Sequence, residues 1–258
     1  MPTDPPRPAR PARLPRLVAH RGASGSAPEN TLAAFRRAGA LGASWVEFDV
    51  TLLGDGTPVI FHDATLDRTT DRTGPLNAIG RADLATIDAG LRFGPAFAGE
   101  RIPTLAETLA LLRDAGLSAN IELKPHGASV ETAAAVADAL AGMAVPLPGI
   151  TVSSFDHRSL AAFREHAPSV PVAPLFETPA PGWRETAAAL RAEAVHVGRN
   201  AADAALVAAA HAAGLALRCY TVNDRAEAAR RAAAAGGDAI FTDYPERFLG
   251  DPYWGASP

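Results

Sequence analysis

Short runs of apolar and β-branched residues alternate along the chain with longer, alanine-rich segments whose apolar positions recur every three to four residues. The short runs are typical of buried strands, and the longer period is typical of helices that cover a sheet. We expect strands over Leu17–His20, Trp45–Val50, Ser118–Lys124, Gly149–Ser153, Val170–Leu175, Ala194–Val197, Leu215–Tyr220 and Ala239–Thr242. We expect helices over Thr31–Ala40, Leu105–Ala115, Val130–Ala141, Asp156–His166, Gly182–Arg191, Asp203–Ala213 and Arg225–Ala235.

This alternation repeats about eight times with short connections, which predicts a parallel sheet covered by helices. Eight such units can close into a (β/α)8 TIM barrel, and this is the fold that we predict. An open, doubly wound sheet is the structural alternative. It is disfavoured because no Gly-x-Gly-x-x-Gly sequence follows any of the strands in the right place.

The repeat is first interrupted between residues 48 and 62, where there is no room for a helix. Asp55 and Gly56 are the preferred pair for a type I′ turn, so we expect a β-hairpin. If these two residues form the whole loop, Asp49 lies directly opposite His62 on the partner arm, with the two side chains on one face. The hairpin would therefore bring a histidine beside a carboxylate.

A second interruption runs from about Ala64 to Pro103, a stretch rich in Thr, Arg, Gly and Asp with weak periodicity. It is too long for an ordinary loop. We interpret it as a small insertion after the first hairpin that caps the mouth of the barrel. The chain as a whole then divides into a disordered Pro/Arg-rich arm over residues 1–16, one barrel domain over residues 17–250, and a tail over residues 251–258.

Composition narrows the function classes. The net charge of −4 gives no argument for a nucleic-acid partner. The single cysteine, Cys219, excludes an internal disulfide framework and a cysteine-rich zinc site, and it fits a reducing compartment, so we expect a cytoplasmic protein. No run approaches the roughly 18 apolar residues of a membrane span, so we expect no stable membrane insertion. The oligomeric state stays open.

Side chains at the C-terminal ends of barrel strands converge on one face. Collecting these ends, together with the hairpin, gives a group of titratable residues: His20, Arg21, Glu47, Asp49, His62, Glu122 and Lys124. Lys124 is the only lysine beside twenty-three arginines. On a strand it would share a face with Glu122, while Ile121 and Leu123 take the other face.

Three carboxylates on one face repel each other unless a cation lies between them, and oxygen ligands favour Mg²⁺ or Ca²⁺ over zinc. The alternative is a site without metal, in which the carboxylates pair with Arg21, Lys124 or Arg218. Two histidines beside enough carboxylates indicate general acid and base. The small loop over residues 22–31 offers backbone amides that could help hold a phosphate. Phe155 and Tyr220 also fall at strand ends and could line the pocket.

The order and spacing of several motifs resemble the glycerophosphodiester phosphodiesterase family from about Leu17 to Leu249. The motifs are His20-Arg21-Gly22, Ala27-Pro28-Glu29-Asn30-Thr31, Glu47-Phe48-Asp49-Val50, Pro58-Val59-Ile60-Phe61-His62-Asp63, Leu66-Asp67-Arg68-Thr69-Thr70, Ile102-Pro103-Thr104-Leu105, Ile121-Glu122-Leu123-Lys124 and Thr242-Asp243-Tyr244-Pro245. In one place the chain departs from the family, because Tyr220 stands where a tryptophan is common.

The resemblance implies metal-dependent hydrolysis of glycerophosphodiesters to glycerol 3-phosphate and an alcohol. It implies one bound divalent cation, Mg²⁺ or Ca²⁺, held by Glu47, Asp49 and Glu122. The same resemblance implies that His20 and His62 are the general acid and base, in either order. It also implies that Arg21 and Lys124 bind the substrate phosphate. The nucleophile could be water or a hydroxyl of the substrate's own glycerol. The expected partner is a small-molecule phosphodiester.

Three alternatives to this function stay open at the level of sequence. The first is a phosphodiesterase of lysophospholipase D type, which needs an apolar groove or a membrane-binding surface. The second is an aldolase in which Lys124 forms a Schiff base with a carbonyl substrate. The third is a barrel that binds phosphodiesters without turning them over.

Overall fold

The computed structural model describes residues 16–227, 236–251, 253 and 254. Nearly all of the predicted arm (residues 1–16) and part of the predicted tail lie outside the described residues, as does most of the last predicted helix (Arg225–Ala235). The strands are β1 (Leu17–Ala19), β2 (Trp45–Leu52), β3 (Pro58–Ile60), β4 (Ser118–Leu123), β5 (Ile150–Ser154), β6 (Val172–Phe176), β7 (Ala194–Gly198), β8 (Ala216–Tyr220) and β9 (Ala239–Thr242).

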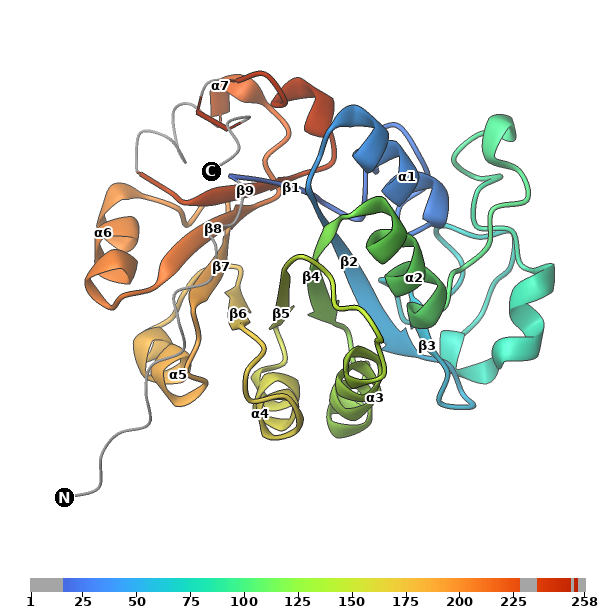
Figure 1. Ribbon diagram of the computed structural model, residues 1–258, viewed down its shortest axis with the longest axis horizontal. Helices are drawn as coiled ribbons and strands as arrows, with labels where there is room; N and C mark the ends of the chain where they lie inside the picture. The colour runs from blue at the N-terminus through green and yellow to red at the C-terminus, as the bar shows by residue number, and fades with distance from the viewer. Residues whose placement is uncertain (1–15, 228–235, 252, 255–258) are drawn as a thin grey trace.

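The sheet order is β1-β9-β8-β7-β6-β5-β4-β2-β3, and β1 also pairs with β2. Eight parallel strands therefore close into a barrel, and β3 is an antiparallel extension of β2. The helices that connect them are α1 (Leu32–Leu41), α2 (Leu105–Ala115), α3 (Ser129–Ala141), α4 (His157–His166), α5 (Trp183–Ala189), α6 (Ala204–Ala212) and α7 (Arg225–Glu227). Figure 1 shows the helices arranged around the strands. The predicted (β/α)8 TIM barrel is confirmed.

Both faces of the barrel strands are buried, one by apolar packing and the other by the barrel interior. In β2, Val46, Phe48 and Val50 point to the surrounding helices and belong to the largest core cluster, together with residues of α1, α2 and α3. The alternate positions Glu47 and Asp49 point the other way and are also buried. The pairing of β1 with β2 closes the sheet, so the parallel barrel leaves no free edge.

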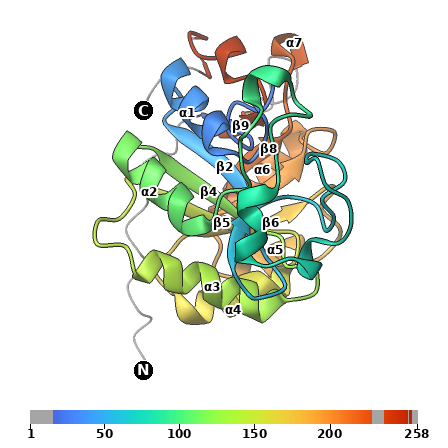
Figure 2. The same cartoon turned by 90° about the vertical axis from the view of Figure 1, so that its right-hand side faces the viewer.

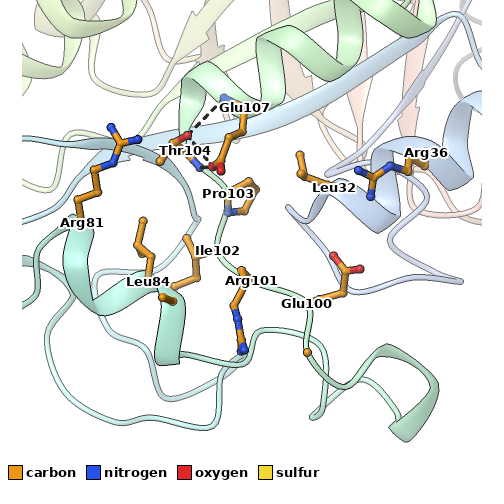
Figure 3. Close-up of a pocket in the computed structure, with 12 residues that line it drawn as sticks. Leu32, Arg36, Arg81, Leu84, Glu100, Arg101, Ile102, Pro103, Thr104 and Glu107 are labelled. Carbon is orange, nitrogen blue, oxygen red and sulfur yellow. Dashed lines mark hydrogen bonds between the residues drawn. The ribbon is translucent and has the colours of Figure 1, made fainter.

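Local signals fix both ends of helix α2. The hydroxyl of Thr104 accepts a hydrogen bond from the backbone N–H of Glu107, whose carboxylate accepts one from the N–H of Thr104 at 2.8 Å (Figure 3). This capping box starts α2, and Gly116 ends it in a left-handed conformation (φ 66°). Both features agree with the sequence pattern.

The hairpin between β2 and β3 differs from the prediction by one residue. Val50 pairs with Ile60, and the N–H of Leu53 donates to the carbonyl of Thr57 at 3.0 Å, so the loop has three residues. Phe61, and not His62, therefore lies opposite Asp49. The longer loop ends at Gly56 (φ 84°) and puts Val59 and Phe61 on the same face as Leu53, where all three belong to the hydrophobic cluster of the insertion. A slip by one residue would turn Val59 and Phe61 to the other face.

The segment over residues 64–103 contains three short 3₁₀ helices, η1 (Leu76–Ala78), η2 (Arg81–Thr86) and η3 (Pro95–Phe97). It has a hydrophobic cluster of its own that includes Leu66, Leu84 and Ile87. In Figure 2 this segment lies in front of the barrel, beside β2. A last 3₁₀ helix, η5 (Pro245–Arg247), follows β9.

Candidate active site

Three buried carboxylates form the centre of the site. Glu47 and Asp49 come from β2 and Glu122 from β4, and the backbone register pairs Asp49 with Glu122 on neighbouring strands. Their side chains offer oxygen atoms that all lie within 4.8 Å of one another. The three residues are between 1% and 7% exposed, so water screens their charges poorly.

Two cations share this space with the carboxylates. Arg21 lies just beyond the end of β1 in a left-handed conformation (φ 54°), which lets both His20 and Arg21 reach the mouth. Its Nε lies 3.2 Å from Asp49 Oδ2. Lys124 follows the end of β4, with Nζ 2.5 Å from Glu122 Oε1 and 3.7 Å from Asp49 Oδ1. Of the three cations in the metal-free alternative, Arg21 and Lys124 contact Asp49 and Glu122, whereas Arg218 pairs with Glu193.

The acids outnumber these bases, and the pKa values reflect it. Burial and the charge of Asp49 raise the pKa of Glu122 to about 7, against the attraction of Lys124. Burial, with the charges of Asp49 and Glu122, raises the pKa of Glu47 well above its ordinary value. Asp49 keeps a lowered pKa although burial opposes it, because Arg21 and Lys124 face it.

This imbalance is what a bound cation would correct. Glu47 Oε1 is buried and accepts no hydrogen bond within the described part of the chain. A carboxylate in that state costs free energy unless a proton or a metal ion meets it. Three clustered carboxylate oxygens suit a hard divalent ion, so these side chains fit Mg²⁺ or Ca²⁺.

Each predicted catalytic histidine is held by a carboxylate. Nδ1 of His20 lies 2.6 Å from Asp243 Oδ1, and its Nε2 faces the triad, 3.9 Å from Glu47 Oε2. Nδ1 of His62 lies 2.6 Å from Asp63 Oδ1. Such a contact fixes the orientation and tautomer of an imidazole, so that its other nitrogen is free for chemistry.

Asp243 and Asp63, which contact the two histidines, each accept further hydrogen bonds, but from different groups. Asp243 accepts hydrogen bonds from Asn223 Nδ2 at 2.6 Å and from Ser24 Oγ at 3.0 Å. Asp63 accepts from the guanidinium of Arg68. Against the effect of burial, the contact with His20, together with those from Asn223 and Ser24, lowers the pKa of Asp243 to about 2. The contacts with Arg68 and His62 lower the pKa of Asp63 to about 2 in the same way. Both are therefore ionised at neutral pH.

Several supporting residues were quoted from the sequence as parts of motifs without a role: Glu29, Asn30, Asp63, Arg68 and Asp243. Asp243 directly follows β9, so the rule that collects strand ends would have found it if applied to the last strand. Asn30 donates to Asp49 Oδ2 at 2.8 Å. No spacing rule predicts this contact, because it depends on how the loop after β1 folds back.

Most backbone amides of the loop after β1 are already hydrogen-bonded within the protein. Within residues 22–31, the N–H groups of Gly22, Ala23, Gly25, Ala27 and Asn30 all donate to backbone carbonyls. The expectation that this loop offers backbone amides is therefore wrong for these positions. The loop instead delivers side chains, above all Glu29 and Asn30, to the mouth.

Two aromatic side chains meet at the mouth. The ring centroids of Phe155, after β5, and Tyr220, at the end of β8, lie 5.8 Å apart in an edge-to-face arrangement. Lys124 Nζ lies 5.3 Å from the ring centroid of Phe155, which is 46% exposed. The hydroxyl of Tyr220 is buried without a hydrogen-bond partner among the described residues.

A separate hollow of about 380 Å³ lies between residues 81–103 of the insertion and helices α1 and α2 (Figure 3). Its three arginines, Arg36, Arg81 and Arg101, point in different directions and do not converge (Figure 3). None of the residues predicted for catalysis or metal binding lines it. This hollow is not part of the candidate site.

The chain is similar to known proteins over most of its length. The glycerophosphoryl diester phosphodiesterase family model matches residues 20–247. The glycerophosphodiester phosphodiesterase of Caldanaerobacter subterraneus subsp. tengcongensis is 36% identical over 236 residues, which cover 90% of this chain and 96% of that protein. A Bacillus subtilis glycerophosphodiester phosphodiesterase is 31% identical over 250 residues, covering 90% of this chain and 84% of that protein.

Among solved structures, an Oleispira antarctica phosphodiesterase in complex with the product sn-glycerol-3-phosphate superposes with a TM-score of 0.89. It shares 37% sequence identity, and the match covers 92% of this chain and 96% of that one. The fold and these matches define a phosphoric diester hydrolase. The chain belongs to the glycerophosphoryl diester phosphodiesterase family.

Proposed function

We propose that this enzyme hydrolyses glycerophosphodiesters to glycerol 3-phosphate and an alcohol, with the help of one divalent cation, Mg²⁺ or Ca²⁺. The observation that carries the proposal is the buried triad of Glu47, Asp49 and Glu122, which has more negative charge than Arg21 and Lys124 neutralise. A bound cation supplies Lewis acidity and neutralises charge on the phosphate.

The reacting phosphodiester is an anion, so an incoming nucleophile meets repulsion. Arg21 and Lys124 would bind its non-bridging oxygens and stabilise the charge that grows on them. One of His20 and His62 takes a proton from the nucleophile as its oxygen bonds to phosphorus. The other protonates the alcohol oxygen as its bond to phosphorus breaks. Asp243 and Asp63 keep the two imidazoles oriented for these transfers.

The environment of Lys124 supports this role over that of a Schiff-base nucleophile. Burial alone would lower the pKa of Lys124, but the charges of Glu122 and Asp49 outweigh it and raise that pKa. The ammonium group therefore stays charged, whereas an aldolase lysine must be neutral to attack a carbonyl.

Phe155 and Tyr220 would line the pocket beside the phosphate. Their edge-to-face pair and the buried hydroxyl of Tyr220 offer an apolar surface with one polar contact for a small polyol or headgroup. No helix among the described residues is long and apolar enough to cross a membrane. The composition and the buried position of Cys219 support a cytoplasmic enzyme that acts on small diesters.

An activity screen tests the proposal. Glycerophosphocholine, glycerophosphoethanolamine, glycerophosphoglycerol and a lysophospholipid are each offered with Mg²⁺, with Ca²⁺ and with EDTA. We expect release of glycerol 3-phosphate from at least one glycerophosphodiester and its loss with EDTA. Release of lysophosphatidate alone would favour the lysophospholipase D reading, and no turnover of any diester would reject the function.

A further inference from the structure

A single guanidinium group of the insertion joins both sides of the site. Nε and Nη2 of Arg68 donate to the two carboxylate oxygens of Asp63 at 2.6 and 3.1 Å. Nη1 and Nη2 donate to the two oxygens of Glu29 at 2.7 and 2.8 Å. Arg68 therefore spans two carboxylates that lie 34 positions apart in the sequence (63 minus 29).

Each of these carboxylates also contacts a residue of the proposed catalytic set. Glu29 Oε1 accepts from Arg21 Nη1 at 2.8 Å, and Asp63 Oδ1 lies 2.6 Å from His62 Nδ1. The contacts form an unbroken chain in the order Arg21, Glu29, Arg68, Asp63, His62. It links the arginine that would bind the phosphate to one of the two histidines.

We propose that Arg68 is a positioning residue that holds Arg21 and His62 in one common geometry. The insertion would then act as part of the catalytic machinery and not only as a cover over the mouth. The roles of Arg21 and His62 come from the function proposed above, but the coupling between them follows from the contacts alone.

Only an arginine fits this position. Its planar fork supplies several donors in fixed directions and can bind two carboxylates at once, whereas a lysine ammonium is a compact charge that lacks this geometry. The backbone around Arg68 is also fixed, because Thr70 Oγ1 donates to the carbonyl of buried Leu66 at 2.8 Å. Asp67 accepts from the N–H of Gly74 at 3.1 Å.

The other histidine does not depend on the insertion. Asp243, which holds His20, is bound by Asn223 and Ser24, and these residues belong to the barrel and its loops. Loss of Arg68 should therefore disturb Arg21 and His62 while the pair of His20 and Asp243 keeps its contacts. This asymmetry makes the proposal specific.

The test compares Arg68→Met, Arg68→Lys and Arg68→Ala with the wild type and with Arg81→Met, a control arginine of the insertion that is exposed and lies outside the chain of contacts. We expect kcat/KM for the best glycerophosphodiester to fall about 10- to 100-fold in Arg68→Met, as is usual when a residue that orients a catalytic group is lost. Arg68→Lys should recover little of it, and Arg81→Met should stay close to wild type.

Chemical rescue separates positioning from stability. The Arg68 side chain is 48% exposed, so a free guanidinium ion can reach the space that Arg68→Ala leaves. Millimolar guanidinium chloride, far below the concentrations that unfold proteins, should restore part of the activity of Arg68→Ala, and tetramethylammonium should not. A loss of activity that follows a fall in Tm and resists guanidinium would make Arg68 a stability residue and overturn the proposal.

Calorimetric titration with inorganic phosphate in Mg²⁺ gives a readout that needs no turnover. Arg68→Met should weaken phosphate binding, and Glu29→Gln should add little when combined with it, because both break one chain. Additive effects, or unchanged phosphate affinity together with full activity, would reject the proposal. If phosphate affinity depends on Arg68 but the wild type hydrolyses no diester, only the proposed function is rejected.

Discussion

The barrel contains charged side chains at two levels, and the two sets are built differently. Toward the N-terminal ends of the strands, Arg218 Nη2 lies 3.0 Å from Glu193 Oε1, and its Nη1 lies 3.1 Å from His196 Nε2. At the C-terminal ends, three carboxylates face the two cations Arg21 and Lys124. Both sets are largely buried, so burial alone does not distinguish a structural cluster from a functional one.

The balance of charge does distinguish them. In the lower set, one acid meets one base, and burial together with Arg218 lowers the pKa of His196 far enough to keep it neutral. In the upper set the acids exceed the bases. Burial together with the charge of Asp49 raises the pKa values of Glu47 and Glu122, against the attraction of Arg21 and Lys124. A balanced buried set stabilises itself, whereas an unbalanced one indicates where a charged ligand belongs.

The largest expected effect is the loss of kcat when either histidine of the active site is removed. His20→Ala and His62→Ala should each lower kcat by about 10²–10⁴-fold, since each removes one proton transfer. Their Tm should stay near that of the wild type, because both side chains are partly exposed. His166→Ala, at the end of α4, is the matched control. Near-wild-type turnover in either variant would remove that histidine from the mechanism.

Arg218→Met disrupts the cluster of Arg218, Glu193 and His196, and it should lower stability while leaving kcat nearly unchanged. It leaves Glu193 without its ion-pair partner, so we expect a loss of about 3–5 kcal/mol in the free energy of unfolding, measured with urea. The kcat of the molecules that remain folded should change little. A large loss of kcat at unchanged stability would place Arg218 in the active site and contradict the division into two levels.

The pH dependence of stability reports on the excess negative charge of the triad. Without a cation, the folded-state pKa of Glu122 is raised to about 7, above its ordinary 4.5, so its proton favours the folded state. This contribution is complete below pH 4.5 and is lost as the pH rises through about 7. His62 and His196 have lowered pKa values in the folded protein, so their contribution to stability rises with pH up to about 6.5. Their contribution has to be removed before that of Glu122 can be measured.

The difference between wild type and Glu122→Gln performs that subtraction. In EDTA, the free energy of unfolding of the wild type should fall relative to the variant between pH 4.5 and 7. Excess Mg²⁺ should reduce this fall, because the ion replaces the proton. A flat difference curve in EDTA would mean that the triad carries no excess charge.

The smallest expected effect concerns the aromatic pair at the mouth. Tyr220→Phe removes only the buried hydroxyl, so kcat/KM should drop about 2- to 10-fold if the substrate supplies its missing hydrogen bond. Stability should be unchanged or slightly higher, since no partner in the described protein is lost. An unchanged kcat/KM for every diester would show that the substrate does not reach this hydroxyl.

Most of the fold is readable from the sequence because every barrel strand is a short apolar run between helical segments. Predicted and observed strand ends agree within two residues, as for Trp45–Val50 against Trp45–Leu52. The predicted register of the hairpin between β2 and β3 was wrong by one residue. Turn residues alone suggested a two-residue loop, whereas the burial of Val59 and Phe61 beside Leu53 in the insertion selects three.

The site was predictable only in its innermost part. The ends of the first barrel strands and the hairpin gave the seven charged or titratable residues that the structure brings to the mouth. Their supports depend on contacts between distant segments, such as His20 with Asp243, which are 223 positions apart. Arg68 is a further case, since its position depends on how the insertion folds.

Restoration of activity by metal is the most direct test of whether the carboxylate triad binds a cation that turnover requires. The protein is stripped of metal with a chelator, and hydrolysis of its best glycerophosphodiester is followed as Mg²⁺ or Ca²⁺ is returned, beside Glu47→Gln and the lower-level control Glu193→Gln. We expect no turnover without metal, full recovery in the wild type, and little recovery in Glu47→Gln. Undiminished turnover by the metal-free wild type would contradict it.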